Sequence, residues 1–248
     1  MLLKKTVLVT GGARDIGQAI CLKFAKKGYQ VIFNYYQSEA KAGATLEQLT
    51  TLGTKSLAIQ ADLTNQAGVD KLMNEATASF DSIDVLVNNT GGLVARRPLT
   101  EMDTDFIDQV MDLNFKSTVL TCRAVIPNMP PGSSVVNVSS QAARDGGGGG
   151  SALYAASKAA MSSFTRSMAK EFGPSGIRVN SVCPGMIDTL FHDRMTADEV
   201  RANFEATVPL RRQGRSEDVA ELVFFLATEK ASFITGANYD INGGAILS

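Results

Sequence analysis

The sequence predicts an α/β fold of the doubly wound type, in which helices cover both faces of one parallel sheet. Short runs rich in Val and Ile alternate with segments of ten or more residues that have helical periodicity. The first apolar run ends in two glycines, Gly11 and Gly12, and no Pro- or Ser-rich linker or internal repeat interrupts the alternation. We therefore expect residues 1–248 to form a single domain.

Strands are expected where a short apolar run precedes a turn, and helices where apolar residues recur every three or four positions. In the first helix, Ile16, Ile20 and Phe24 lie along one side. The expected strands are residues 6–10, 31–34, 56–60, 85–88, 135–139, 179–182 and 238–241. The expected helices are residues 15–27, 38–52, 66–80, 103–125, 153–172 and 216–227. Residues 186–207 are expected to be less regular.

Composition limits the classes of partner. With 44% apolar residues the chain can bury a sizeable core, and its net charge of −1 gives no electrostatic reason to expect nucleic acid or an anionic membrane. The N-terminal apolar run is too short for a signal peptide, and no run approaches about 18 apolar residues. Cys21, Cys122 and Cys183 are odd in number and far apart, which favours buried thiols over disulfides or a metal site. We expect a cytoplasmic protein that binds no metal.

Tyr154 and Lys158 are the first candidate catalytic residues. They are four positions apart in an Ala-rich helical run, so both lie on one helix face. A phenol beside an ammonium, with the Ser140 hydroxyl arriving from the end of an apolar run, is a way to lower the pKa of tyrosine for acid–base work near neutrality. Taken alone, the spacing is also typical of a helix with an exposed Lys and a half-buried Tyr.

The turn after the first strand, TGGARDIG, is the first candidate binding site. In a doubly wound sheet, ligands bind at the carboxyl ends of the strands, where a helix N-terminus and bare N–H groups meet a pyrophosphate. The general G-x-G-x-x-G pattern fails here: Gly12 and Gly17 have the right separation, but Arg14 stands between them. A turn that only packs a helix onto a strand would look similar.

Several motifs in order resemble the compact branch of the short-chain dehydrogenase/reductase family, from residue 6 almost to residue 248. The family's T-G-x-x-x-G-x-G turn falls on Thr10, Gly11 and Gly17, with Asp15 at the middle glycine. Its remaining motifs fall on the acid Asp62, the N-N-A-G segment Asn88–Asn89–Thr90–Gly91, the helix asparagine Asn114, the residues Ser140, Tyr154 and Lys158, the Pro184–Gly185 segment with Thr189, and the closing strand 238–244.

The resemblance implies a Rossmann-type fold and reversible hydride transfer between a nicotinamide and a carbonyl or alcohol carbon. Tyr154 would protonate the carbonyl oxygen, Lys158 would lower the phenol's pKa and bind the nicotinamide ribose, and Ser140 would orient the carbonyl. Ser139 is the alternative serine, and Asn114 would hold a water that links Lys158 to solvent. The residues that would bind the cofactor are Gly11, Arg14, Asp15, Ile16, Gly17, Asn34, Tyr35, Asp62, Leu63, Asn88, Thr90, Gly91, Tyr154, Lys158, Pro184, Gly185, Ile187 and Thr189.

Two residues depart from the family's pattern. Asp15 places a carboxylate near the phosphate site, which should repel a pyrophosphate unless it points away or pairs with Arg14; an acid does suit the first turn of a helix. Thr90 adds a hydroxyl to which we assign no role. At the end of the second strand Asn34 replaces the acid that holds the ribose of NAD. With Arg14 facing that ribose, we expect NADP(H) to be preferred over NAD(H).

Other features near the expected site have ordinary alternatives. Arg96 and Arg97 are either solvated surface charge or an attraction for an anionic substrate. His192 is either an ordinary loop residue or a substrate contact in residues 186–207, which by resemblance would form a lid over the substrate. The run 146–150 is five glycines and is expected to be mobile.

Three functions remain open at this stage. The resemblance favours an NADP(H)-dependent reductase or dehydrogenase like the 3-oxoacyl-(acyl carrier protein) reductases. A sugar dehydrogenase of the same family is the first alternative, and a nucleotide sensor or scaffold without turnover is the second. Family likeness also implies a homotetramer paired through the helices that begin near Asp103 and Leu153 and through the C-terminal strand.

Overall fold

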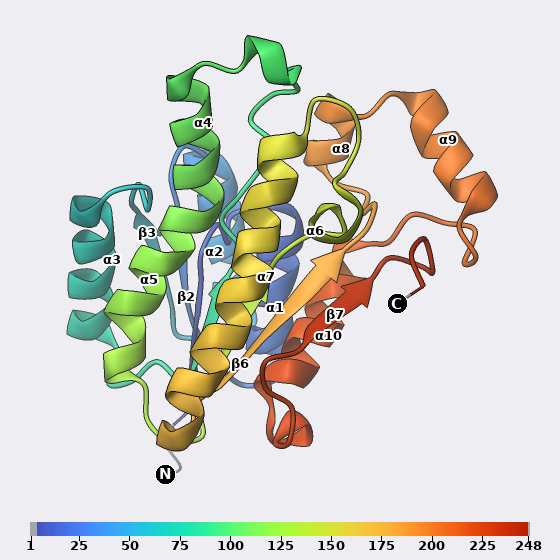
Figure 1. Ribbon diagram of the computed structural model, residues 1–248. Coiled ribbons are helices and arrows are strands. Elements are labelled where there is room, and N and C mark those ends of the chain that lie inside the picture. The colour runs from blue at the N-terminus through green and yellow to red at the C-terminus, as the bar shows by residue number, and fades with distance from the viewer. Residues whose placement is uncertain (1–3, 248) are drawn as a thin grey trace.

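The computed structural model describes residues 4–247, except for the side chains of His192 and Arg194. Seven strands form one parallel sheet in the order β3-β2-β1-β4-β5-β6-β7, with helices on both faces (Figure 1). The strands are β1 Thr6–Val9, β2 Gln30–Tyr35, β3 Ser56–Gln60, β4 Val85–Asn88, β5 Ser134–Val138, β6 Arg178–Pro184 and β7 Asn238–Ile241. The doubly wound parallel sheet predicted from the sequence is therefore confirmed.

Alternation along the strands divides the core between the two faces. Val7 and Val9 of β1 point to the face covered by α1 (Asp15–Lys26), α2 (Glu39–Thr51) and α10 (Ser216–Ala227). Leu8 points to the face covered by α3 (Gln66–Ser79), α5 (Ser117–Val125) and α7 (Ala152–Phe172). Because every inner strand is buried on both sides, β1 and β4 read as continuous apolar runs.

Two expected segments differ from the sequence-based boundaries. The helix predicted over residues 103–125 is α4 Thr104–Met111 and α5 Ser117–Val125, joined by a π-helical segment, η2 Asp112–Lys116. The stretch expected to be irregular contains α8 Leu190–Met195 and α9 Asp198–Thr207. The remaining short elements are α6 Ala142–Asp145 and the 3₁₀ turns η1 Leu99–Glu101, η3 Ile126–Asn128, η4 Gly173–Ser175 and η5 Glu229–Ala231.

The topology fixes where a ligand is expected. The chain runs outward from β1 to β3 and then returns to β4 beside β1, so the strand order reverses between β1 and β4. In open parallel sheets, ligands bind beyond the carboxyl ends of the strands at this reversal.

No helix within residues 4–247 is long and apolar enough to cross a membrane.

Candidate active site

A cleft of about 1060 Å³ lies at the carboxyl ends of the strands. It brings together residues from the β1–α1 turn, the ends of β2 to β6, the start of α7 and the segment that leads into α8. Of the predicted site residues, the following line it: Gly11, Arg14, Asp15, Ile16, Gly17, Asn34, Tyr35, Asp62, Leu63, Thr90, Gly91, Ser140, Tyr154, Lys158, Pro184, Gly185, Ile187 and Thr189. The two predicted residues that do not line the cleft are Asn88 and Asn114.

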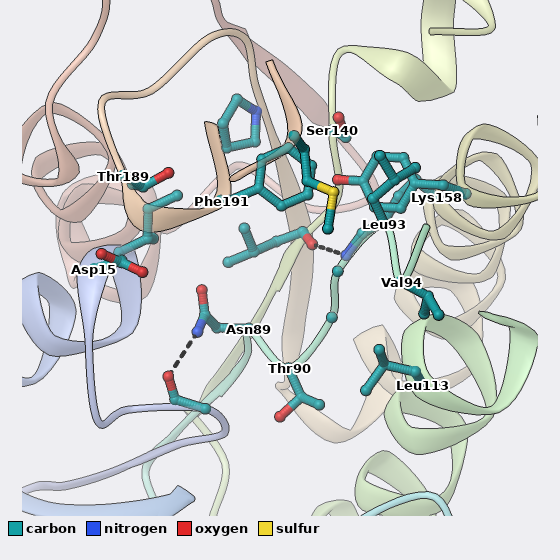
Figure 2. A pocket seen from close by; sticks show the side chains of 18 of the residues that line it. Asp15, Asn89, Thr90, Leu93, Val94, Leu113, Ser140, Lys158, Thr189 and Phe191 are labelled. Atoms are coloured by element: carbon teal, nitrogen blue, oxygen red, sulfur yellow. Dashed lines mark hydrogen bonds between the residues drawn. The ribbon is translucent and has the colours of Figure 1, made fainter. Parts of the chain in front are cut away.

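Asn88, which was predicted to contribute to the cofactor site, turns its side chain into the core and does not line the cleft. Asn88 is 1% exposed, and its amide donates to Asn137 Oδ1 at 2.8 Å and to Cys122 Sγ at 3.2 Å, inside the core. Successive residues of a strand point to opposite faces, so the next residue, Asn89, faces the turn instead. Asn89 Nδ2 donates to the carbonyls of Thr10 and Gly11, each at 3.1 Å, and Figure 2 shows one of these two bonds.

Asn114 is fully buried in the π-helical segment η2, and its side chain hydrogen-bonds the backbone of the loop that follows β4. Its Oδ1 accepts from the backbone N–H of Gly92 at 2.8 Å, and its Nδ2 donates to the Gly92 carbonyl at 2.9 Å. This two-way pair fixes the Gly91–Gly92 loop at the edge of the cleft. π-Helical turns inside α-helices are frequently found at functional sites.

Ser140 and Tyr154 meet across the cleft. A hydrogen bond from the Ser140 hydroxyl lowers the pKa of the Tyr154 phenol, but burial raises that pKa by more. Ser139, the alternative serine, instead donates to the carbonyl of Lys158 at 2.8 Å and contacts Ser162 Oγ at 3.0 Å. Ser139 is thus occupied in fastening α7 to β5, and Ser140 is the serine beside the phenol.

The predicted lowering of the phenol's pKa by Lys158 does not appear in the structure. Lys158 Nζ lies 5.9 Å from the centre of the Tyr154 ring and donates to the carbonyl of Val138 at 2.8 Å. The amine is itself buried, with 3% of the residue exposed, and burial lowers its pKa to about 8. The net pKa shift of Tyr154 is upward, so the phenol is protonated at neutral pH and suited to donate a proton.

Close approach explains two glycines of the β1–α1 turn. Gly11 has φ +65°, in the left-handed region that only glycine adopts freely. A Cβ on Gly17 would stand 2.1 Å from the Gly11 carbonyl oxygen and 2.7 Å from Asn89 Nδ2. The turn can therefore bring bare backbone and the N-terminus of α1 to the floor of the cleft only with glycine at these positions.

Asp15 departs from ordinary backbone geometry, with φ +50°. Its Oδ2 accepts from Arg14 Nη1 at 2.5 Å, and its Oδ1 lies 3.5 Å from the backbone nitrogen of Leu190. Figure 2 shows the Asp15 carboxylate beside Thr189. The carboxylate therefore pairs with Arg14, one of the two arrangements in which the sequence would tolerate it.

At the expected adenosine end, Asn34 stabilises the protein's own backbone. Its Nδ2 donates to the Ala61 carbonyl at 2.9 Å and its Oδ1 accepts from Gly11 N–H at 3.4 Å, so this side chain is already engaged. Asp62 accepts from the hydroxyl of Thr64 at 2.8 Å. Thr90 Oγ1 is buried and has no hydrogen-bond partner within the described residues, although Thr90 lines the cleft.

The other end of the cleft has an apolar wall that the sequence analysis did not identify. Figure 2 shows Leu93, Val94 and Leu113 on one side and Phe191 near Ser140. The Phe191 ring centre is 6.2 Å from that of Tyr154, with an interplanar angle of 36°. Val94 has φ +65°, which is strained for a β-branched residue. Leu93 and Val94 lie in a loop, Leu113 in the π-helical segment η2 and Phe191 in α8, so no single periodic pattern in the sequence marks them as one wall.

The two arginines near the mouth are engaged with the protein. Arg96 donates to the carbonyls of Gly149 at 2.9 Å and Met195 at 3.3 Å, and so joins the glycine run to the end of α8. Arg97 pairs with Asp103 at 3.1 Å and stacks over the Phe106 ring. The glycine run expected to be mobile thus has a fixed partner in Arg96.

Salt bridges also hold the expected lid. Arg201 of α9 pairs with Asp188 and Asp193, at 2.5 and 2.6 Å, and its Nε donates to Gln213. These contacts fasten α9 both to Asp188, in the segment that leads from β6 into α8, and to Asp193 of α8 itself. His192, expected to be either an ordinary loop residue or a substrate contact, lies in this region, and its side chain is outside the described residues.

Within residues 4–247, no group of three or more His, Cys, Asp or Glu side chains is placed to hold a metal. Cys21, Cys122 and Cys183 are free and buried, as the sequence suggested. Burial raises the pKa of the Cys122 thiol to about 12, and the pKa values of the other two are raised as well. All three behave as small packed residues.

The cleft fits a nicotinamide dinucleotide. A glycine turn presents bare backbone at the N-terminus of α1, Thr90 offers a buried hydroxyl without a partner, and the Ser140–Tyr154 pair lies at the far end beside Lys158. Such a sheet, with a nucleotide-sized cleft that ends at a phenol and an amine, defines a nicotinamide-dependent oxidoreductase.

Comparison with known proteins places the chain within one family. A family model described as enoyl-(acyl carrier protein) reductase matches residues 11–245. The chain is 37% identical over 249 residues to the 3-oxoacyl-[acyl-carrier-protein] reductase of Staphylococcus aureus, with 100% of both covered. A short-chain dehydrogenase from Burkholderia cenocepacia in complex with NADP superposes with a TM-score of 0.91 at 34% identity, covering 98% of each chain. An NADH-dependent reductase responsible for alginate metabolism gives 0.90 at 34% identity, covering 100% of this chain and 99% of that one.

The chain belongs to the short-chain dehydrogenase/reductase family. It is an oxidoreductase that transfers a hydride between a nicotinamide cofactor and a ketone or secondary alcohol.

Proposed function

We propose that the protein is an NADP(H)-preferring reductase of 3-oxoacyl thioesters. The observation that carries the proposal is the placement of Ser140, Tyr154 and Lys158 together on the wall of a dinucleotide-sized cleft, beside its apolar end. The apolar wall favours an acyl chain over a polyhydroxylated sugar. The likeness to the S. aureus 3-oxoacyl reductase supports the same substrate class.

Ser140 and Tyr154 would handle the substrate oxygen. Hydride is supplied by the reduced nicotinamide when it is bound. As the carbonyl carbon gains the hydride, the Tyr154 Oη–H bond breaks and its proton moves to the carbonyl oxygen, while Ser140 donates a hydrogen bond to the same oxygen. The raised pKa of Tyr154 keeps this proton in place at neutral pH before the reaction.

Lys158 and Asn114 would support that proton transfer. The charged Lys158 amine, 5.9 Å from the centre of the Tyr154 ring, would supply the proton that re-forms the phenol after the step. Asn114 Oδ1 and Lys158 Nζ both border Gly91, where a Cβ would come within 2.7 and 2.9 Å of them, so the two side chains flank one small space at the loop. We propose that a water held there carries protons between Lys158 and solvent, and that Lys158 also binds the nicotinamide ribose.

The NADP(H) preference rests on charge at the adenosine end. No acid stands at the end of β2, where Asn34 is engaged with backbone and Tyr35 follows. Arg14 also lines the cleft, in the turn whose Gly11 contacts Asn34, and would supply a cation for a 2′-phosphate. A kcat/KM for NADH above that for NADPH would refute this preference.

Turnover on a defined panel tests the substrate. With NADPH followed at 340 nm, we expect acetoacetyl thioesters to be reduced faster than aldoses are oxidised with NADP. Crotonyl thioesters test the enoyl reduction in the family model's description; because a phenol places its proton on oxygen, we expect little activity there. NADPH binding without turnover on any of them would favour the alternative of a nucleotide sensor.

We further propose that residues 186–207 act as a substrate lid on a single domain spanning residues 1–248. Phe191 beside Tyr154 and the Arg201 contacts support the lid. The protein is proposed to be a cytoplasmic homotetramer without nucleic-acid or membrane partners. The three buried free thiols are in keeping with a reducing compartment, and exposed apolar residues on α4 and before β7 are in keeping with assembly.

A further inference from the structure

We propose that Asp15 determines how strongly the enzyme distinguishes NADPH from NADH, because it holds the Arg14 guanidinium in an ion pair. The inference rests on the proposed function, since it takes Arg14 as the group that would meet the 2′-phosphate. It concerns a carboxylate at the position where the family's turn has a glycine.

The ion pair lies on the cleft wall. Arg14 and Asp15 both line the cleft, with 2.5 Å between Nη1 and Oδ2. Their side chains are 43% and 23% exposed, so solvent screens the pair only in part. Among the described residues, Asp15 is the acid that pairs with Arg14.

Backbone geometry and a second contact fix where the carboxylate lies. At φ +50° Asp15 is in the left-handed region, which aspartate and asparagine tolerate better than most residues. Its other oxygen, Oδ1, lies 3.5 Å from the backbone nitrogen of Leu190, where α8 begins. The carboxylate is therefore held between the β1–α1 turn and α8, with one oxygen toward Arg14.

The Asp15 carboxylate affects the binding of NADPH and of NADH differently. A 2′-phosphate carries about two negative charges and competes with Asp15 for the Arg14 guanidinium. NADH has no such group. Repulsion between Asp15 and the pyrophosphate acts on both cofactors alike, so it cancels in the ratio of their dissociation constants. The ratio therefore isolates the effect of Asp15 on Arg14.

The test is a double-mutant cycle read by equilibrium binding. Asp15→Asn removes the charge, retains the shape and suits the backbone conformation. Arg14→Met removes the guanidinium. Dissociation constants for NADPH and NADH are measured by nicotinamide fluorescence for the wild type, both single variants and the double variant. An exposed ion pair of this kind predicts that Asp15→Asn raises the ratio Kd(NADH)/Kd(NADPH) by up to about fivefold. With methionine at residue 14, the same Asp15→Asn change should leave that ratio unaltered.

Each outcome decides the question. A rise in the ratio that needs Arg14 supports the inference. If both cofactors bind more tightly to Asp15→Asn but the ratio is unchanged, Asp15 acts only on the pyrophosphate and the inference is overturned. An equal rise with methionine at residue 14 overturns it too. If the wild type binds neither cofactor, the proposed function itself fails, which is a separate result.

Discussion

Tyr154 is the residue on which the proposed proton transfer depends. Tyr154→Phe removes the Oη proton but keeps the ring against Phe191, so we expect kcat to fall by about 10²–10⁴-fold while the Kd for NADPH changes little. Tyr239→Phe in β7 is the matched control, which should leave kcat unchanged. Initial rates with acetoacetyl thioester and fluorescence titration of NADPH give both quantities. Near-normal turnover by Tyr154→Phe would contradict the mechanism.

The buried amine of Lys158 should give the enzyme a pH limit on its alkaline side. Burial lowers the pKa of Lys158 to about 8, so it is mainly charged at neutral pH and loses that charge as pH rises through this value. Tyr154, with its raised pKa, stays protonated over the same range. We expect kcat/KM for reduction to be flat below about pH 7 and to fall about tenfold per unit well above about pH 8.

A pH series in constant ionic strength measures this limit. Lys158→Arg keeps a positive charge throughout, so whatever activity remains in it should lose the alkaline fall. A wild-type profile that stays flat to about pH 10 would show that the charge of Lys158 is not required.

Individual site residues were predictable from the sequence where a motif fixes both type and spacing. Ser140, Tyr154 and Lys158 lie together as expected. Asn88 does not line the cleft, because a side chain at the end of β4 turns into the core and the following residue takes its place. The pKa shift of Tyr154 could not be predicted either, because it depends on how deeply the folded chain buries the phenol, and residues distant in sequence, such as Phe191 of α8, approach its ring.

Gly17 joins α1 to the end of β1 at a distance that a side chain would forbid. Gly17→Ala would drive its Cβ to 2.1 Å from the Gly11 carbonyl oxygen, so we expect it to lower the free energy of unfolding by about 1–3 kcal/mol and to weaken NADPH binding. Gly43→Ala is the matched control: Gly43 lies within α2, and a Cβ there meets nothing within 4 Å. That control should raise the free energy of unfolding by about 0.5–1 kcal/mol.

Urea denaturation and NADPH titration of both variants make the comparison. If Gly17→Ala had the same free energy of unfolding as the wild type, the turn would have accommodated the extra methyl group at no energetic cost. The close packing at Gly17 would then not contribute to stability.

Whole elements were more predictable than their interruptions. Apolar runs indicate the buried strands of a parallel sheet, and helical periodicity indicates the amphipathic helices. The first and last residues of these elements agree closely with those expected. The π-helical segment around Asn114 was not visible, because one extra residue in a turn scarcely alters the apolar pattern. Helices α8 and α9 were missed because they pack partly on the cleft rather than on the sheet.

The assembled molecule can be tested by its mass. One chain is 26.4 kDa, and light scattering after size exclusion should give about four times that value for the proposed tetramer. Phe233, just before β7, is fully exposed in the single chain, so Phe233→Asp should reduce the mass if this face is buried on assembly. Leu52→Asp, at the end of α2, is the control and should not. A monomer mass for the wild type would refute the tetramer.

The buried amides beneath the site have a consequence for protein engineering. Asn88 donates to Asn137, and Asn137 donates to Thr165 of α7, the helix that carries Tyr154 and Lys158. These hydrogen bonds are directional, so they fix the position of α7 along its axis relative to β4 and β5. Apolar contacts alone would allow the helix to shift by a fraction of a turn. Replacing these polar groups with aliphatic ones is therefore compatible with a higher thermal stability, but it would remove the contacts that position the Tyr154 phenol against the substrate carbonyl.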